Sequence, residues 1–315
     1  MLGAGGVAGG AFHAGVLAAL AEATGWDPRR ATVIVGTSAG SITGATLRAG
    51  LSAADMLARA QDRPLSAAGE RLLRDVRPPQ PPRPRPPVRQ GRLPAQVAST
   101  LARAAARPLS TRPWALLAGL LPEGTVSTDL ISDSIGGMLG ERWPSEPLWV
   151  CAVRQADGRR VVFGRDGNRP ALPDAIAASC AIPAFFNPVV IDGEAHIDGG
   201  VHSPTNADVL RRSADDLDLV LVSSPMSITG RRLRIGTDQA VRRWSGALLD
   251  AEVLQLRRRG LPVLAFQPTP DDAGVMGLNA MDPSRRTAIA RQAHASTLRR
   301  LDRADTRARL APLFA

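Results

Sequence analysis

The chain contains no lysine and no tyrosine, and cysteine occurs at only two of its 315 positions. Arginine therefore carries the whole net charge of +10. The two cysteines, Cys151 and Cys180, have no CxxC spacing and no further thiols that could complete a zinc site. Because free cysteine is among the most often buried residue types, we predict two small buried residues and no disulfide.

Aromatic residues are also scarce, with six phenylalanines and five tryptophans. A basic protein is attracted to nucleic acid or to an anionic membrane surface, and charge alone does not choose between them. Proteins that bind single-stranded nucleic acid stack bases on interleaved aromatic side chains, which this chain lacks. We therefore expect no nucleic-acid partner.

Long apolar runs are absent as well. No uninterrupted run of 18 apolar residues occurs, and the start lacks the basic stretch and apolar core of a secretory signal. These absences predict neither a membrane span nor export, and hence a cytoplasmic location. With 44% hydrophobic residues, the chain can bury a substantial core, and we expect a single domain over residues 1–315.

The order of apolar segments predicts an α/β fold with a mostly parallel central sheet. The apolar segment 32–35 has the β-branched composition of a strand covered on both faces, and a helical segment, 39–49, follows it closely. Such an order begins a parallel sheet whose crossovers are helices. Further strands are expected at 148–153, 160–163, 189–191, 217–222 and 263–266, and helices at 11–23, 173–181, 237–258 and 283–304.

Residues 63–125 break this pattern. Their middle, 77–87, is rich in proline and arginine, which excludes helix and central strand. Short apolar helices are expected on either side, at 93–106 and 114–121. We interpret the segment as an insertion that forms a lid or lipid-contacting cap. Five arginines precede an apolar stretch that contains Trp114, which favours peripheral contact with an anionic membrane; a solvated linker is the alternative. The arginines are Arg77, Arg83, Arg85, Arg89 and Arg92.

Residues 36–40 read Gly-Thr-Ser-Ala-Gly, which matches the G-x-S-x-G pattern of a nucleophile elbow. The pattern is weak on its own in a chain with 30 glycines, and a structural Gly-Ser turn is the alternative. Its context is more specific, because it follows a buried-type strand and opens a helix. The first amides of that helix would stabilise negative charge beside the serine. We therefore predict Ser38 as a nucleophile.

A dense glycine stretch at residues 3–10 precedes the first expected helix. Backbone amides in such a turn can bind an anion. Gly3, Gly5 and Ala8 match a dinucleotide-binding spacing, yet only two residues precede them where a strand is required. The alternative is an oxyanion hole facing a substrate carbonyl. In that case the amides of Gly5, Gly6 and Val7 would form the oxyanion hole.

A Ser-Asp-His hydrolase uses the same elbow, but several strands precede the elbow in that fold, whereas only one strand and one helix fit before Ser38 here. It also needs a histidine base. His13 follows the glycine stretch, and His294 lies on a helix of alternating arginine and alanine, where a surface position is expected. His196 and His202 flank Asp198, so both stay candidates.

Four blocks of the sequence, taken together and in order, resemble the patatin-like phospholipase family. Residues 3–20 are similar to its oxyanion block and first helix, and residues 36–41 to its elbow. Residues 178–189 resemble its Ala-Ser-x-Ala-x-Pro block, and residues 197–201 its Asp-Gly-Gly motif. The blocks cover roughly residues 3–206, with the C-terminal third compatible in outline.

The resemblance implies a three-layer patatin-like α/β fold with helices on both faces of the sheet. It also implies a Ser38–Asp198 dyad that hydrolyses lipid acyl esters through an acyl-serine intermediate, without a metal or other cofactor. A phospholipase A or lysophospholipase is the expected type. Asp198 would accept the Ser38 proton directly, with its basicity raised by burial. Four glycines would support the two motifs: Gly36, Gly40, Gly199 and Gly200. Without the other blocks, residues 198–200 would be an ordinary Asp-Gly turn.

Two departures from the family pattern leave alternatives open. Val7 and Gly9 stand where the family has a third glycine and then a basic residue, and only Met1 and Leu2 precede the glycine stretch as a first strand. A thioesterase or acyltransferase could use the same dyad. The alternative from another class is a catalytically silent lipid-binding scaffold.

Overall fold

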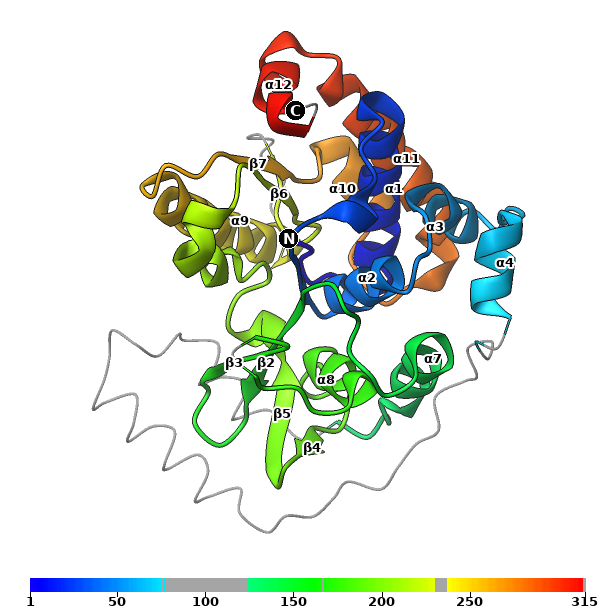
Figure 1. Ribbon diagram of the computed structural model, residues 1–315, viewed down its shortest axis with the longest axis vertical. Coiled ribbons are helices and arrows are strands. Elements are labelled where there is room, and N and C mark those ends of the chain that lie inside the picture. Colours follow the sequence, from blue (N-terminus) through cyan, green and yellow to red (C-terminus); the bar gives the residue numbers. More distant parts are fainter. Residues whose placement is uncertain (75, 77–123, 166, 230–236, 314–315) are drawn as a thin grey trace.

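The computed structural model describes residues 1–74, 76, 124–165, 167–229 and 237–313 (Figure 1). Its α-helices are α1 Gly6–Thr24, α2 Ala39–Arg48, α3 Ala53–Ala60, α4 Ala67–Leu73, α7 Asp129–Leu139, α8 Leu172–Ser179, α9 Thr237–Arg257, α10 Pro270–Met276, α11 Arg286–Leu301 and α12 Ala304–Arg309. Its strands are β1 Ile34–Thr37, β2 Leu148–Arg154, β3 Arg160–Phe163, β4 Val189–Ile191, β5 Glu194–Asp198, β6 Val220–Ser223 and β7 Val263–Phe266. Short 3-10 helices are η1 Pro28–Arg30, η2 Gly199–Val201, η3 Ala207–Asp216, η4 Pro283–Arg285 and η5 Ala311–Leu313.

One half of the sheet is parallel. β1 pairs with β2 and β6 pairs with β7, both in parallel. Leu2 lies between these pairs and forms parallel bridges to Gly36 and Ser223. The Leu2 amide donates to the Val35 carbonyl at 2.8 Å, and the Gly3 amide donates to the Ser223 carbonyl at 2.9 Å. The residues before the glycine stretch thus connect β1 to β6.

The other half of the sheet is antiparallel, so the prediction of a mostly parallel sheet is wrong there. β2 pairs antiparallel with β3 and with β5, and β4 pairs antiparallel with β5. Tight turns explain the β2–β3 and β4–β5 pairings, because two adjacent strands joined by a short turn must run in opposite directions. Asp192 and Gly193 join β4 to β5 with φ values of 50° and 78°. The described sheet is therefore mixed.

Helices cover both faces of this sheet, as the alternation of buried side chains shows. Ile34 and Val150 belong to one hydrophobic core, whereas their neighbours Val35 and Cys151 belong to another. The first core includes residues of α1, α2, α8 and α11, and the second includes residues of η3 and α9. Side chains alternate between the two faces of a strand, so each core lies on its own face. The expected layering of helices on both faces is present.

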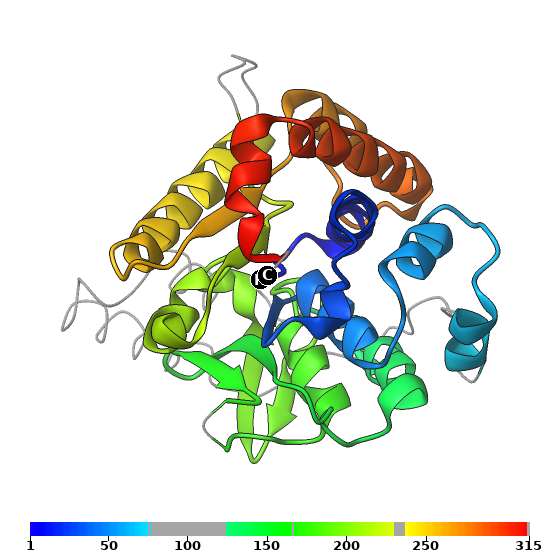
Figure 2. The same ribbon diagram turned by 45° about the horizontal axis from the view of Figure 1, so that its top comes forward.

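Helix α1 lies at the centre of the first core, beside α2, α3 and α11 (Figures 1 and 2). Gly15 allows a close approach, since a Cβ there would lie 2.6 Å from the Ala290 carbonyl oxygen of α11. Of the described helices, α1 is long and apolar enough to cross a membrane by length and composition. Most of it is buried inside the protein, which is typical of a core helix.

Several predicted elements match the structure, with shifted ends. The strands at 160–163 and 263–266 have the predicted bounds, whereas the helix expected at 11–23 already begins at Gly6. The helix expected at 283–304 is divided into η4 and α11. β5 and five helices, α3, α4, α7, α10 and α12, were not predicted from the sequence.

Within the expected insertion, 63–125, helix α4 is described, as are Gly124 and Thr125. The proline-rich run, its arginines and the two flanking helices expected at 93–106 and 114–121 lie outside the described residues. The lid and its membrane contact therefore stay predictions from sequence.

Candidate functional site

The pairing of β2 brings Ser38 and Asp198 together. Thr37, the last residue of β1, pairs with Cys151, and Asp198, the last residue of β5, pairs with Ala152. Both Cys151 and Ala152 also pair with β3, which occupies the other edge of β2. β1 and β5 therefore share one edge of β2 and end on adjacent residues of it. Because β1 and β5 run toward each other along this edge, Ser38, which follows β1, lies near Asp198, which ends β5.

The turn at Ser38 has the geometry of a strained elbow. Ser38 has φ 53° and ψ −123°, a conformation that side-chain-bearing residues rarely adopt. Glycine is required on both sides of it: a Cβ at Gly36 would lie 2.4 Å from the Cα of Ser41, and one at Gly40 would lie 1.9 Å from the Leu2 carbonyl oxygen. The turn presents Ser38 at the N-terminus of α2, where the helix dipole favours negative charge.

Buried hydroxyl groups hold this turn in place. The Ser38 amide donates to Ser179 Oγ at 2.9 Å, and Ser179 Oγ donates to the Cys151 carbonyl at 2.6 Å. On the other side of the turn, Ser41 Oγ donates to the Ser38 carbonyl at 2.7 Å. All three serines are buried. Ser179 therefore connects the elbow to β2, the strand with which β5 also pairs.

The Asp198 carboxyl is buried beside the Ser38 hydroxyl. Burial raises the pKa of Asp198 from 3.8 to about 6, while hydrogen bonds from the Ser38 side chain and the Gly200 amide oppose the shift. The Gly200 amide donates to Asp198 Oδ1 at 2.7 Å. A Cβ at Gly199 would lie 2.2 Å from the Cys151 carbonyl oxygen, so the loop passes too close to β2 for any side chain there.

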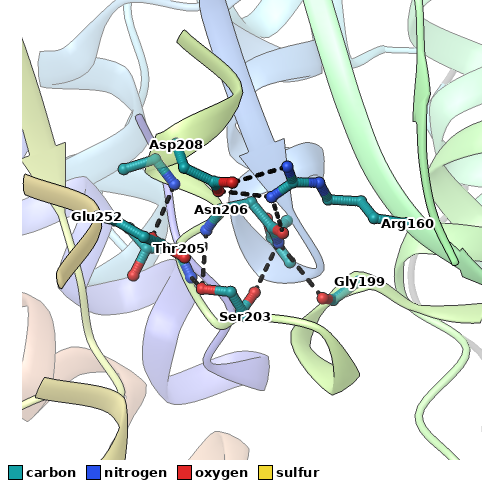
Figure 3. A network of polar contacts seen from close by, with 9 residues as sticks. Arg160, Gly199, Ser203, Thr205, Asn206, Asp208 and Glu252 are labelled. Atoms are coloured by element: carbon teal, nitrogen blue, oxygen red, sulfur yellow. Dashed lines mark hydrogen bonds and ion pairs between the residues drawn. The ribbon is translucent and has the colours of Figure 1, made fainter. Parts of the chain in front are cut away.

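A polar network around Asn206 connects the end of β1, before Ser38, with the Gly199–Gly200 loop, after Asp198 (Figure 3). Asn206, in the left-handed conformation at φ 53° and ψ 33°, donates from Nδ2 to Thr37 Oγ1 at 3.1 Å, to the Gly199 carbonyl at 3.3 Å and to the Ser203 carbonyl at 2.6 Å. Asparagine tolerates this conformation better than most residues. Its side chain thus contacts the residue before Ser38 and the residue after Asp198.

One ion pair and two further hydrogen bonds hold Asn206 and the residues that follow it (Figure 3). Arg160 of β3 donates to Asn206 Oδ1 at 3.1 Å and to both carboxylate oxygens of Asp208, at 2.6 and 2.9 Å. Glu252 of α9 accepts a hydrogen bond from the Ala207 amide at 2.9 Å. A bidentate arginine–carboxylate pair restricts geometry more than a single contact does. The segment after the Asp-Gly-Gly motif is therefore anchored to β3 and to α9.

The glycine-rich turn begins α1 next to the elbow. Gly5 precedes the helix, and Gly6, at φ 58°, and Val7 are its first residues. Gly6 and Val7 line the same cavity as Ser38. The next amide, that of Ala8, donates to Ala280, whereas the amides of Gly5, Gly6 and Val7 donate no hydrogen bond to any described residue. The turn therefore offers free donors and the positive end of α1 to an anion.

Gly9 explains one departure from the family pattern. It is buried, and a Cβ there would lie 3.2 Å from Pro225 Cγ. A long basic side chain at this position would have to displace Pro225.

His13 is buried behind the glycine-rich turn. Its Nε2 lies 2.8 Å from the Gly3 carbonyl oxygen and its Nδ1 lies 2.8 Å from Ser223 Oγ. Because a carbonyl only accepts, Nε2 carries the proton and Nδ1 accepts from the serine. Burial lowers the pKa of His13 to about 4, so the ring is neutral at pH 7. His13 therefore holds the turn in place as a neutral residue.

None of the four histidines, all of which are described, lines the cavity that contains Ser38. His196 Nδ1 donates to the Glu194 carbonyl at 2.9 Å, and its ring packs edge-on against Phe163. His294 lies 3.0 Å from a carboxylate oxygen of the exposed Glu22 and is itself partly exposed, in line with the expected surface position. The geometry thus offers no histidine base on the cavity side of Ser38.

Ser38 opens on a largely apolar cavity of about 590 Å³. Its size lies within the range of about 300–1,000 Å³ that is typical of ligand pockets. The apolar wall comprises Ala11, Ala14, Ile42, Leu51, Met56, Val126, Leu130, Ile131, Ile182, Phe185, Phe186 and Met281. Cys180 also lines it and, like Cys151, is a buried free thiol whose pKa is raised by burial. The predicted burial of both cysteines is confirmed.

The sequence analysis did not assign a role to Ser179, Asn206, Arg160 or His13 in shaping the site. Ser179 lies within the quoted Ala-Ser-x-Ala-x-Pro block, but its contact with the Ser38 amide joins residues 141 positions apart. Asn206 follows the Asp-Gly-Gly motif with no local pattern that marks it. Only the folded arrangement reveals these contacts.

Comparisons with known proteins found a family model and solved structures that this chain resembles. A family model described as Patatin-like phospholipase matches residues 1–211. No curated protein matches the chain. Among solved structures, the crystal structure of VipD from Legionella pneumophila is similar, with a TM-score of 0.41 and 15% sequence identity over 95% of this chain. The chain spans 65% of the length of that protein.

Proposed function

The chain belongs to the patatin-like phospholipase family, whose members are lipid acyl hydrolases, and on this premise we propose that it cleaves acyl esters of lipids with Ser38 as nucleophile and Asp198 as base. The observation that carries the proposal is the meeting of three groups at one cavity. Ser38 lines the cavity together with Gly6 and Val7, whose amides donate to no described residue, and the buried Asp198 carboxylate accepts a hydrogen bond from the Ser38 side chain.

In the first half-reaction, Asp198 accepts the Ser38 proton as Oγ attacks the carbonyl carbon of the ester. A carboxyl pKa of about 6 suits this role, because the group is ionised at pH 7 yet more basic than an exposed aspartate. The developing oxyanion would accept hydrogen bonds from the amides of Gly5, Gly6 and Val7. Collapse of the intermediate breaks the ester C–O bond, and Asp198 returns its proton to the leaving alcohol. Acyl-Ser38 remains.

In the second half-reaction, a water molecule replaces the alcohol. Asp198 removes one of its protons while the oxygen attacks the acyl carbon, and the same amides bind the second oxyanion. The C–O bond to Ser38 then breaks, Ser38 recovers the proton from Asp198, and a fatty acid is released. No histidine is needed in either half.

The apolar lining of the cavity favours a lipid substrate, with one acyl chain bound beside the nucleophile. Its wall is mostly aliphatic and aromatic, including Ile131, Phe185 and Phe186. Burial of an acyl chain is favourable by about 0.8 kcal/mol for each methylene removed from water. We therefore propose a phospholipase A or lysophospholipase type of esterase.

The experiment that tests this proposal is labelling with a fluorophosphonate probe, combined with measurement of fatty acid released from a lysophospholipid. Wild-type protein should be labelled at Ser38 and should release fatty acid. Ser38→Ala should abolish both, and Asp198→Asn should slow hydrolysis by about 10²- to 10⁴-fold, the usual contribution of a general base.

The matched controls are His202→Gln and Ser41→Ala. Retained activity in His202→Gln supports a dyad, whereas a loss as large as that of Ser38→Ala in a folded protein would restore a triad. Absence of labelling and of turnover in the wild-type protein would favour the lipid-binding scaffold. Ser41→Ala removes the neighbouring serine hydroxyl, which supports the elbow but is not the proposed nucleophile. Labelling should slow yet persist, because Ser38 remains, and its persistence shows that the probe reacts with Ser38.

A further inference from the structure

Two arginines interrupt the otherwise apolar wall of the cavity that contains Ser38. Arg59 comes from α3, and Arg286 is the first residue of α11. Both line the cavity together with Met281 and Gly6. Both side chains are partly exposed, so hydration limits the cost of their charge. Two cations at one lipid-sized cavity still create a positive potential that favours an anionic group there, which the acyl chain does not supply.

The packing of α1 against α11 places Arg286 beside the N-terminal half of α1. Contacts advance together along the two helices: Gly6 packs against Ala280 and Met281, Gly15 packs against Ala290, and Glu22 pairs with His294. The helices are therefore parallel, and Arg286 lies four residues before the contact at Gly15. A group bound by Arg286 would share the cavity with Gly6 and Val7, where the ester carbonyl is proposed to bind.

The charges at this end do not balance among the described residues. Arg286 forms an ion pair with Asp62, but its Nε atom is buried and has no hydrogen-bond partner. Arg59 forms no ion pair with any described carboxylate. Although part of Arg59 is exposed, desolvation lowers the pKa of its guanidinium, and repulsion from Arg286 lowers it further. Of the two arginines, only Arg286 therefore has a carboxylate partner among the described residues.

We propose that Arg59 and Arg286 bind the phosphate group of a glycerophospholipid substrate while its acyl chain occupies the apolar part of the cavity. The inference rests on the proposed function and extends it to the substrate class. Arginine suits this role because its planar guanidinium presents several donors in the geometry that phosphate accepts. In a glycerophospholipid the phosphate is joined to the acyl ester through the short glycerol backbone. One molecule can therefore place an ester at Ser38 and an anion at this end.

The test compares two substrates that differ only in the phosphate: a lysophosphatidic acid and the monoacylglycerol with the same acyl chain, both in micelles of a neutral detergent. Arg59→Gln and Arg286→Gln should each lower kcat/KM for lysophosphatidic acid by about 10- to 100-fold, the effect of losing a hydrogen bond to a charged group. The loss for monoacylglycerol should be far smaller. Arg63→Gln is the matched control, because Arg63 is exposed, lies near Arg59 and does not line the cavity.

A binding measurement separates failure of this inference from failure of the proposed function. An ether analogue of lysophosphatidic acid cannot be hydrolysed, so its affinity for the Ser38→Ala protein does not depend on turnover. Arg59→Gln or Arg286→Gln in that background should weaken binding by about 10-fold or more, and Arg63→Gln should not. If wild-type protein hydrolyses neither substrate, the proposed function fails while the binding result still decides on the phosphate site.

Three results would overturn the inference. Equal losses on both substrates would show that the arginines act on the fold or on the reaction in general. Equal weakening by Arg63→Gln would show that overall charge attracts the lipid. Competition by inorganic phosphate as strong as that by the ether lipid would show a site for free phosphate, with no role for the lipid.

Discussion

The burial of Asp198, the proposed base, should lower the free energy of unfolding at neutral pH, and this effect can be measured. In the structure its carboxyl is buried and has a pKa of about 6, against 3.8 for an exposed aspartate. The folded state therefore favours the protonated form. The stability that this form contributes is fully present below about pH 3.8 and is lost as the pH rises through about 6.

The size of the effect follows from the two pKa values. A tenfold change in proton affinity corresponds to about 1.36 kcal/mol, so the change from 3.8 to about 6 corresponds to about 3 kcal/mol. Asparagine resembles the protonated carboxyl in shape, and its Oδ1 can still accept the hydrogen bond from the Gly200 amide. Asp198→Asn should therefore raise the free energy of unfolding by up to about 3 kcal/mol above pH 7. Below about pH 4 the gain should vanish.

Urea unfolding of wild type and Asp198→Asn across this pH range measures the difference directly. Taking the difference cancels other titrating groups, including His13, which are common to both proteins. The control is Asp192→Asn, which changes an exposed aspartate in the β4–β5 turn and should show no such pH dependence. A gain that is absent at neutral pH, or equally large in acid, would refute the argument that burial raises the pKa of Asp198.

Four other predictions concern the site and the insertion. The value of kcat/KM for an acyl ester should rise with pH through about 6 as Asp198 ionises; a flat profile in this range would contradict its role as base. Ser38→Gly should end activity yet stabilise the protein by about 1–3 kcal/mol in urea unfolding, because glycine accepts the elbow conformation without strain. Ser179→Ala should lower the free energy of unfolding by about 1–3 kcal/mol and also reduce turnover, since it leaves the Ser38 amide without an acceptor; unchanged values would show that this contact is dispensable. In vesicle sedimentation, binding should increase with anionic lipid and largely disappear when residues 77–121 are replaced by a Gly-Ser link; equal sedimentation of both proteins would exclude the insertion as the contact.

The elbow could be predicted from sequence because its causes are local. A short apolar strand, two glycines and a helix lie within a few residues of Ser38, and the close contacts at Gly36 and Gly40 show why no other residue fits. The glycine-rich turn was visible for the same reason, although its helix begins earlier than expected. Where the local backbone excludes a side chain, the sequence must have glycine, and such positions can be recognised from sequence alone.

The partner of Ser38 could not be found in this way. Asp198 was assigned through the family resemblance, because an Asp-Gly-Gly turn has no distinctive property by itself. β5 carries Glu194 and His196 and lacks the apolar composition expected of a strand. Since β5 escaped detection, its antiparallel pairing with β2 and the mixed sheet did too. The contacts of Asn206 depend on that pairing, and those of Ser179 join α8 to the distant elbow and to β2, so neither could be predicted from sequence.

β1 and β5 share one edge of β2, and this sharing limits which changes in the chain the site can tolerate. Ser38 directly follows β1 and Asp198 ends β5, so their separation depends on the single peptide step between Cys151 and Ala152. Segments that follow either strand can change in length without moving the two groups apart. A bulge in β2 at this step would separate them, although β2 itself contributes no reacting group. The spacing of the proposed reaction centre is thus set by a strand that takes no part in the chemistry.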